Sequence, residues 1–243
     1  MNAGAPPVEP TQRRAPTASV DKVGIRRREL AEAALSAIAE RGYANTGMRD
    51  IAQWSSLSHG SLHYYFSDKD DLVALAVWNY KAECARRYDP IVETAATGAE
   101  LTERFGIAMA ETLRDEASLH RLWYDLRNQA LFTEGFRETI VAIDALLESM
   151  VWMVLSRFAE LEDRAIIVTP TLAYSLFDGL FQNALIRFLR GDLDAVDTDI
   201  RMDNLLSVRF RGSRNRGVLD PEHGADLRAQ VVGIEVECFF ALA

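Results

Sequence analysis

Apolar residues recur at helical spacing near the start of the chain. Leu30, Ala34 and Ile38 stand four residues apart within residues 22–41, which is the pattern of an amphipathic helix that buries one side. Gly42 follows at the position where a helix end favours a left-handed backbone conformation. The pattern therefore predicts a first helix that ends just before this glycine.

Two much shorter helices are predicted next, over residues 48–54 and 59–65. The side-chain oxygens of Asn45 and Thr46 are placed to cap the first of them, and Ser58 is placed to cap the second. The expected buried side chains are Met48, Ile51 and Ala52 on the first short helix, and Leu62 and Phe66 on the second. Two short helices joined by a tight turn form a helix-turn-helix, whose second helix is able to enter the major groove of DNA.

The second short helix carries side chains suited to reading DNA. Ser61, His63, Tyr64 and Tyr65 can donate or accept hydrogen bonds at base edges and phosphates, and Gly60 permits close approach of the backbone. None of these residues is acidic. The pattern indicates that this helix is a recognition helix.

A fourth helix is predicted to begin directly afterwards. Residues 67–70 resemble a capping box, and Lys69 stands within it. Free backbone N–H groups at a helix start, together with a lysine, bind phosphate well. We therefore expect a phosphate contact at this position.

This part of the chain, roughly a quarter of it, resembles the N-terminal domain of TetR-family transcriptional regulators. The matching positions are 39–43, Thr46, 48–52, Ser58, 60–62, Tyr65, Phe66, Lys69 and Leu72. Because many positions of different chemistry agree at once, the resemblance is specific. It implies that DNA is contacted by Thr46, Arg49, Ser58, His59, Gly60, Ser61, His63, Tyr64, Tyr65 and Lys69.

Two positions depart from the family pattern, and several candidates have simpler interpretations. Ser56 stands where the family usually has glycine in the turn, and His63 stands where it usually has tyrosine, so the operator sequence cannot be inferred from relatives. Ser58 and Thr46 are equally well explained as helix caps alone. Arg49 is alternatively a solvated surface charge, and His63 a packed side chain.

Helical patterns continue beyond residue 72, and strand signals are almost absent. Helices are expected up to Tyr88, around 101–112, and over 118–132, 134–159 and 169–190. The predicted fold is all-α, with a three-helix helix-turn-helix domain joined by a fourth helix to a helical bundle for ligand binding and dimerisation. The expected domains are an arm (1–20), a DNA-binding domain (21–67), a ligand-binding and dimerisation body (68–190) and a tail of uncertain structure (191–243).

A small-molecule site is predicted inside the body, because such sites combine aromatic walls with a few polar anchors. The candidates are Trp78, Phe105, Met109, Trp123, Tyr124, Arg127, Asn128 and Phe177. The alternative is that these aromatic side chains only form core. Residues 111–179 also resemble the ligand-binding domain of betaine-pathway-type TetR regulators, but this does not name the effector.

The two longest predicted helices, 134–159 and 169–190, have more apolar surface than one neighbour can cover. In the TetR family such a pair packs against the same pair of a second subunit, and Gly179 would permit close approach there. The resemblance thus implies a homodimer, with an interface formed by Ile143, Leu147, Val151, Phe177, Leu180, Phe181, Ala184 and Phe188. The alternative is a hairpin buried within a monomer.

The charge of the chain is unevenly distributed. Its 27 basic and 36 acidic residues give a formal charge of -9, which disfavours approach to DNA. Residues 11–28, however, contain six basic residues and one acidic residue. This asymmetry is typical of a DNA-facing head on an acidic body.

Several other classes of protein are disfavoured by the sequence. The chain has no run of eighteen apolar residues and no signal-peptide pattern, so we expect a cytoplasmic protein with no membrane partner. Cys84 and Cys238 are too few for a disulfide framework or a zinc site, although a redox switch at Cys84 is a minor alternative. No catalytic grouping has a recognisable spacing, and no cofactor or metal is expected.

Together these features predict a homodimeric repressor that binds a pseudo-palindromic double-stranded DNA operator and is released by a small-molecule effector. Repression, rather than activation, follows from the resemblance alone. The alternatives are a regulator without an effector site and, less favoured, an enzyme built on a helical bundle.

Overall fold

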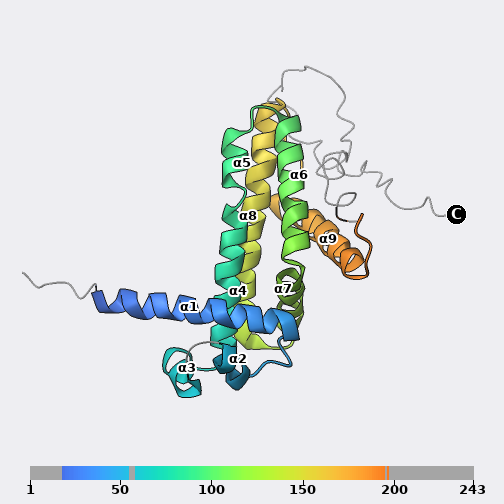
Figure 1. The fold of residues 1–243 in the computed structure, drawn as a ribbon. Coiled ribbons are helices and arrows are strands. Elements are labelled where there is room, and N and C mark those ends of the chain that lie inside the picture. Colours follow the sequence, from blue (N-terminus) through green and yellow to red (C-terminus); the bar gives the residue numbers. More distant parts are fainter. Residues whose placement is uncertain (1–17, 55–57, 195, 197–243) are drawn as a thin grey trace, which may run out of the picture. The chain divides into compact units, whose positions relative to one another are not determined.

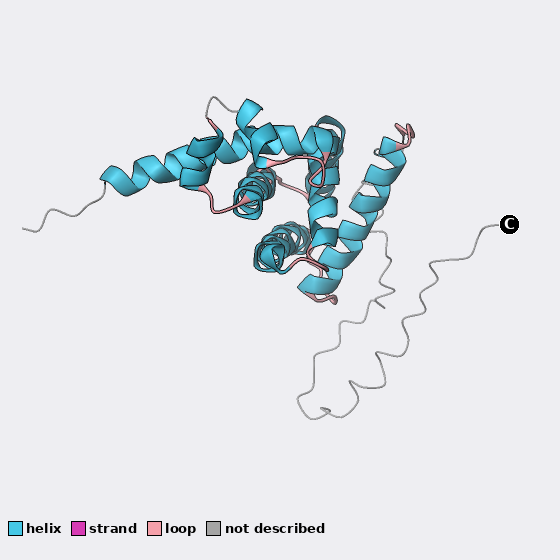
Figure 2. Cartoon of the chain, turned by 90° about the horizontal axis from the view of Figure 1, so that it is seen from below, coloured by secondary structure: helices cyan, strands magenta, loops and turns pink. Residues whose placement is uncertain are grey.

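The computed structural model describes residues 18–54, 58–194 and 196 of the chain. All of them lie within one compact unit, residues 1–208. Every regular element among these residues is a helix, as the cyan ribbon of Figure 2 shows. The all-α prediction is confirmed for this part of the chain, while the predicted tail lies outside it from residue 197 onward.

The first three helices form the head. They are α1 (Ala18–Arg41), α2 (Met48–Trp54) and α3 (His59–Tyr65), and the bounds of the two short helices are those predicted. Helix α1 begins four residues earlier than expected, and Gly42 follows it with a φ of 82°, in the left-handed region. The core of the head contains Ile38, Ile51, Leu62 and Phe66, all almost fully buried.

The two short helices are capped in different ways. Ser58 caps α3 as predicted, because its side chain accepts a hydrogen bond from the Ser61 backbone N–H at 3.2 Å. At the start of α2, Asp50 accepts instead from the Gly47 N–H at 2.8 Å. Asn45 and Thr46 donate to carbonyls at the end of α1, so the prediction that they cap α2 was wrong. Ser56 lies outside the described residues.

Helix α4 (Lys69–Arg86) connects the head to the body. It packs against α1 at one end and against α8 (Arg137–Leu161) further along, and Figure 1 shows α1, α2 and α3 gathered at its N-terminal end. Asp68 caps it by accepting from the Asp71 N–H at 2.8 Å. The same helix therefore touches the recognition domain and the centre of the body.

The body is a bundle around α4 and α8. Its other elements are α5 (Asp89–Thr94), α6 (Gly98–Asp115), α7 (Ala117–Gln129), the short 3-10 helix η1 (Glu134–Phe136) and α9 (Pro170–Leu189). Helix α9 packs on α7 and α8. Asp89 and Pro90, which directly follow the predicted end of the fourth helix, begin α5, since proline is well tolerated in the first turn of a helix.

One helical segment among the described residues, Glu134–Leu161, is long and apolar enough to cross a membrane by length and composition alone. A core helix passes the same test, and Ile143, Val151 and Val154 of this segment are buried within the bundle. The expectation of no membrane partner stays a prediction.

Candidate functional site

The recognition helix α3 turns its polar side outward. Leu62 and the following Phe66 are buried in the head, whereas His59, Gly60 and His63 are exposed. Tyr64 is 78% exposed. The buried side chains of α3 are thus those that the sequence predicted, and most of its polar residues face outward.

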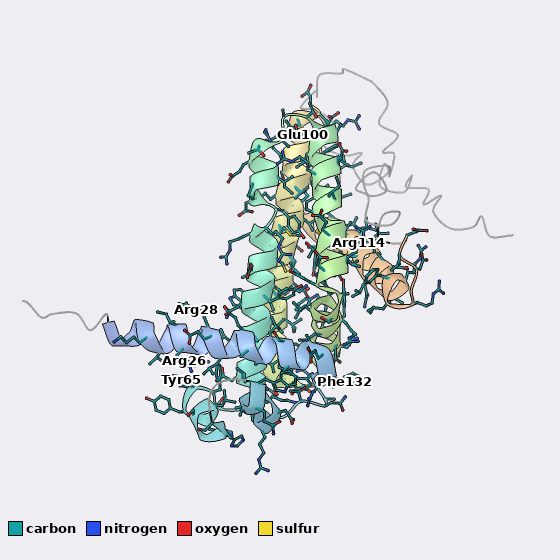
Figure 3. All side chains as sticks on the ribbon, in the orientation of Figure 1. Arg26, Arg28, Tyr65, Glu100, Arg114 and Phe132 are labelled. Atoms are coloured by element: carbon teal, nitrogen blue, oxygen red, sulfur yellow. The ribbon has the colours of Figure 1, made fainter. Side chains whose placement is uncertain are left out.

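Contacts within α3 pre-order its exposed side chains. The Nε2 atoms of His59 and His63 lie 3.3 Å apart, and the rings of Tyr64 and Tyr65 meet edge to face at 5.0 Å between centroids. Tyr65 is half-buried against the core, and its side chain is labelled in Figure 3. Ser61 is also half-buried, and its hydroxyl lies 3.0 Å from that of Ser58, which is exposed.

The candidates outside α3 are placed less uniformly. Arg49 is exposed on α2. Thr46 is buried, and its hydroxyl donates to the Gly42 carbonyl at 3.0 Å, so it supports the turn between α1 and α2. Donation from this hydroxyl to a DNA phosphate would require that bond to break.

Lys69 is directed toward Tyr43. Its Nζ donates to the Tyr43 carbonyl at 3.0 Å and lies 3.6 Å from the centroid of the Tyr43 ring. Burial lowers the pKa of Lys69 below its ordinary value, although the charge of Asp70 opposes that shift. One of the three ammonium N–H donors is used in this bond, and the predicted phosphate contact would use the others.

The predicted ligand residues are mostly packed side chains. Phe105, Met109, Trp123, Tyr124 and Phe177 are buried together in the core. Trp78 and Asn128 are exposed, so the structure does not bring them together with the buried group. An open depression occurs elsewhere, at the C-terminal end of α8; it is lined by Ser156, Ala159, Glu160, Asp163, Arg164, Ala165 and Ile166 and contains none of the predicted residues.

A buried polar cluster joins α4, α6 and α7, and the sequence reasoning missed it. Glu116 accepts hydrogen bonds from the Tyr80 hydroxyl at 2.8 Å and from Arg87 at 2.9 Å. Lys81 Nζ donates to His120 Nδ1 at 3.3 Å, and both side chains are buried. A signal was present in the sequence, since Lys81 lies on the inner face of a helix that is otherwise apolar there.

Burial sets the proton affinities in this cluster. It lowers the pKa of Lys81 to about 8, against the opposing charges of Asp178 and Glu116. Burial, followed by the charge of Lys81, holds the pKa of His120 well below its ordinary value of 6.5. His120 is therefore neutral at physiological pH, beside a lysine that is still largely charged.

A second polar cluster joins α7, α8 and α9. Arg127 pairs with Asp178 and, at 3.4 Å, with Asp144. Tyr124 donates to Asp178 at 3.0 Å, and Tyr174 donates to Asp144 at 2.6 Å. The predicted polar anchor Arg127 is therefore already paired with two carboxylates of its own chain.

We predict that acid destabilises the protein through His120. The unfolded chain takes up a proton on this imidazole as the pH falls through 6.5, but the folded chain does not, so the free energy of unfolding falls with pH. The slope from this one group is at most about 1.4 kcal/mol per pH unit. Urea unfolding between pH 7.5 and 5.5 measures it.

The matched variants are His120→Gln and His63→Gln. Removing His120 should flatten the pH dependence over this range, whereas removing the exposed His63 should leave it as in the wild type. Equal slopes in the wild type and His120→Gln would show that the buried imidazole does not carry the effect.

Several contacts connect the head to the body. Arg121 on α7 donates to the Ala39 carbonyl near the end of α1 at 2.9 Å. The Tyr43 ring lies 5.2 Å from the Phe136 ring of η1, in an edge-to-face arrangement. Arg121 directly follows His120 in the chain, so α7 touches both the buried cluster and the head.

The predicted dimer residues lie largely within the single chain. Ile143, Val151, Phe177, Phe181 and Ala184 are buried, and Leu147, Leu180 and Phe188 are partly buried. The five buried residues are not accessible to a second copy, and Phe177 and Phe181 meet Phe105 of α6 and His120 of α7. The reason is that α9 is apolar on nearly all sides, so the sequence alone could not assign its faces.

A different side of α9 is exposed and apolar. It carries Leu172, Leu176 and Ile186, together with Gly179, where no atom of the described chain would meet an added Cβ within 4 Å. We call this surface the α9 stripe. Its residues recur every three to seven positions, as expected for one side of a helix.

The structure also bears on cysteine and metal chemistry. Cys84 is buried, and burial raises the pKa of its thiol, which disfavours the reactive thiolate. Among the residues that the structure describes, no three His, Cys, Asp or Glu side chains are grouped closely enough to hold a metal ion. Cys238 lies outside that part of the chain.

Comparison with known proteins assigns the head. The sequence family described as "Bacterial regulatory proteins, tetR family" matches residues 30–76. The repressor KstR2 of Mycobacterium tuberculosis is 33% identical over 92 residues, 38% of this chain, and the match spans about half of that relative (46%). BetI of Brucella suis is 32% identical over 76 residues, 31% of this chain and 38% of BetI.

A longer match includes the body. The transcriptional regulator PksA of Bacillus subtilis is 25% identical over 196 residues, which are 78% of this chain and 92% of PksA. A TetR-family regulator from Rhodococcus sp. has the same fold, with a TM-score of 0.61 and 22% identity over 76% of this chain and 97% of that one.

Two further solved structures with this fold contain ligands. FadR of Bacillus subtilis, in complex with stearoyl-CoA, has a TM-score of 0.59 and 18% identity over 74% of this chain and 97% of its own. A regulator from Saccharomonospora viridis, in complex with choline, has a TM-score of 0.59 and 23% identity over 76% of this chain and 95% of its own.

The comparisons agree with the helix-turn-helix geometry and the all-α body. Members of the matched family are regulators and not enzymes, which confirms the prediction of no enzymatic activity. The head, residues 30–76, therefore carries the DNA-binding domain of the TetR family, and the described residues have the fold of TetR-family regulators.

Proposed function

We propose that this protein is a homodimeric transcriptional repressor that binds a pseudo-palindromic operator and is released from it by a small-molecule effector. The observation that carries the proposal is the recognition helix α3, with Leu62 buried beneath it and Tyr64 and both histidines exposed. A helix presented in this way fits the major groove, where its side chains meet base edges. The relative KstR2 is named a repressor, which supports repression as the outcome.

Tyr64 is expected to make a base or phosphate contact. Because the side chain is 78% exposed and contributes little to the fold, Tyr64→Ala should leave the melting temperature unchanged. It should weaken binding to upstream DNA by about tenfold, the size of one good base contact. Electrophoretic mobility shift at fixed salt measures the change.

Two variants sharpen this test. Tyr64→Phe retains the ring and separates a hydroxyl contact from a stacking or apolar contact. Ile107→Ala removes an exposed apolar side chain from α6 in the body and should bind DNA as the wild type does. Wild-type protein that showed no preference for upstream DNA over random DNA at moderate salt would overturn the DNA-binding proposal.

The proposed dimer forms through the α9 stripe. A palindromic operator needs two heads related by a twofold axis, and one exposed apolar helix side can pack against its own copy across such an axis. Leu172, Leu176 and Ile186 supply apolar area, and the open space at Gly179 admits a second backbone.

Effector control is supported by the connection between the buried cluster and the head. Lys81 is on α4, which begins directly after the recognition domain, and His120 is on α7, which holds the end of α1 through Arg121. An effector releases DNA to the extent that it binds the non-binding conformation more tightly. A movement of α4 or α7 changes the position of the head and is the proposed route.

The alternative is a regulator that acts without an effector. The observation that favours it is the close packing of the predicted ligand residues, which are buried against one another. A thermal-shift screen of metabolites separates the two, since only a protein with an effector site is stabilised by specific compounds. The cytoplasmic location likewise remains part of the proposal.

A further inference from the structure

Lys81 is a lysine in an unusual place. Its side chain is only 4% exposed, deep in the body, whereas lysines are rarely buried without a carboxylate partner. The groups in contact with Nζ are His120 Nδ1 at 3.3 Å and the rings of Tyr80 and Trp123, with centroids at 5.3 and 5.2 Å. The carboxylates of Asp178 and Glu116 act on Lys81 from beyond ion-pair distance. Aromatic faces attract a cation but do not neutralise it.

The other cations near this position are paired. Arg87 is 2.9 Å from a Glu116 oxygen, and Arg127 contacts both Asp178 and Asp144. No ion pair recorded among the described residues involves Lys81, and its hydrogen-bond partner His120 is neutral because burial lowers the imidazole pKa. Lys81 thus offers a desolvated ammonium group with unused donor capacity.

A row of aromatic rings leads to this ammonium group. The ring of Phe105 lies 5.9 Å from that of Phe177, Phe177 lies 6.4 Å from Phe181, and Phe181 lies 4.8 Å from the His120 ring. The row is apolar along its length and ends at a polar pair, His120 and Lys81. An amphiphile with one charged end matches this order of surfaces.

We propose that Lys81 binds the carboxylate of the effector and that the row from Phe105 to His120 receives its apolar body, so that the effector is an apolar monocarboxylate. This inference rests on the proposed function, because it assigns the chemical class of the effector. It also implies that a cationic compound of the same size is rejected, since like charges repel strongly in a desolvated site.

Binding at this site would act directly on the head. The ammonium group of Lys81 is enclosed by the buried side chains of Tyr80 on α4 and Trp123 on α7, so a ligand enters only if these two helices separate. Helix α4 begins at Lys69, next to the recognition domain, and α7 holds the Ala39 carbonyl through Arg121. When α4 and α7 separate to admit the carboxylate, the hydrogen bond from Arg121 to the Ala39 carbonyl is displaced, and with it the position of the head.

The test uses three probes that share an octyl chain and differ in head group: octanoate, octan-1-ol and octyltrimethylammonium. Calorimetry and thermal shift on the full-length protein should show octanoate binding at least about tenfold more tightly than the alcohol, with no binding of the ammonium compound. Octanoate should also lower the affinity of the protein for its operator, that is, for the DNA sequence that the protein selects from its own genome. Equal binding of octanoate and the alcohol, or no binding of octanoate, would overturn the proposal.

Lys81→Met is the informative variant, because it keeps the apolar stem and removes the charge. It should lose the preference for octanoate over octan-1-ol, and its melting temperature without ligand should be equal to or higher than that of the wild type. Lys22→Met, at an exposed position on α1, is the matched control and should keep the preference. A Lys81→Met protein that prefers octanoate as the wild type does would overturn the assignment.

Operator binding in the absence of any probe is measured in parallel. If the wild type binds its operator but ignores octanoate, the effector class is wrong and the DNA-binding proposal stands. If it fails to bind DNA, the proposed function fails, whatever the calorimetry shows.

Discussion

A protein carrying both Leu176→Glu and Ile186→Glu is expected to be a folded monomer. The two side chains are 47% and 61% exposed on the α9 stripe, so the glutamates remain hydrated in the monomer but would face one another across a twofold interface. Analytical ultracentrifugation should show half the mass of the wild type. Helical content by circular dichroism should be retained.

The same double variant should lose operator affinity by about 100-fold or more. Linking two heads raises the effective concentration of the second head at its half-site, and dissociation of the dimer removes that gain. Ile107→Glu is the matched control, since Ile107 is 52% exposed on α6 and lies off the stripe. A double variant that still sediments as a dimer would contradict the interface.

Ala184→Glu is expected to behave in the opposite way and to unfold the chain. Ala184 is fully buried between α9 and its neighbours, so a glutamate there is both too large and without a partner for its charge. The expected loss is about 3–5 kcal/mol of unfolding free energy, the range seen for an unpaired buried charge. Urea unfolding followed by circular dichroism measures it.

The free energy of unfolding of Ala184→Glu is compared with that of the double variant at Leu176 and Ile186. Because the double variant is expected to be a monomer, the difference does not include the stability lost when the dimer dissociates. If Ala184→Glu were a folded monomer of equal stability, the residue would face a second subunit, and the assignment of the faces of α9 would be reversed. The two variants therefore separate an intrachain contact from an interface on one helix.

The head was predicted closely because its pattern is redundant. Gly42 marks the end of α1 and Ser58 marks the start of α3, and the hydrophobic periodicity agrees with both. The structure gives α2 and α3 at the predicted residues. The cap of α2 was predicted wrongly, because Asn45, Thr46 and Asp50 all offer suitable oxygens and only the fold selects Asp50.

The centre of the body could not be predicted in the same way. The cluster of Tyr80, Lys81, Glu116 and His120 joins residues up to 40 positions apart, and helical periodicity carries no information on which helices meet. The single-residue signal was Lys81, a charge on an apolar face. Helix α9 posed a related difficulty, since an almost uniformly apolar helix does not reveal which side meets its own chain.

The most direct test of the central proposal is to sequence the DNA fragments that the full-length protein captures from its own genome. We predict enrichment of an inverted repeat whose half-sites are separated by about one helical turn or a multiple of it, as two symmetry-related recognition helices require. The enrichment should be lost in Tyr64→Ala. Captured fragments with no shared motif, or a motif without twofold symmetry, would contradict a dimer that reads DNA through α3.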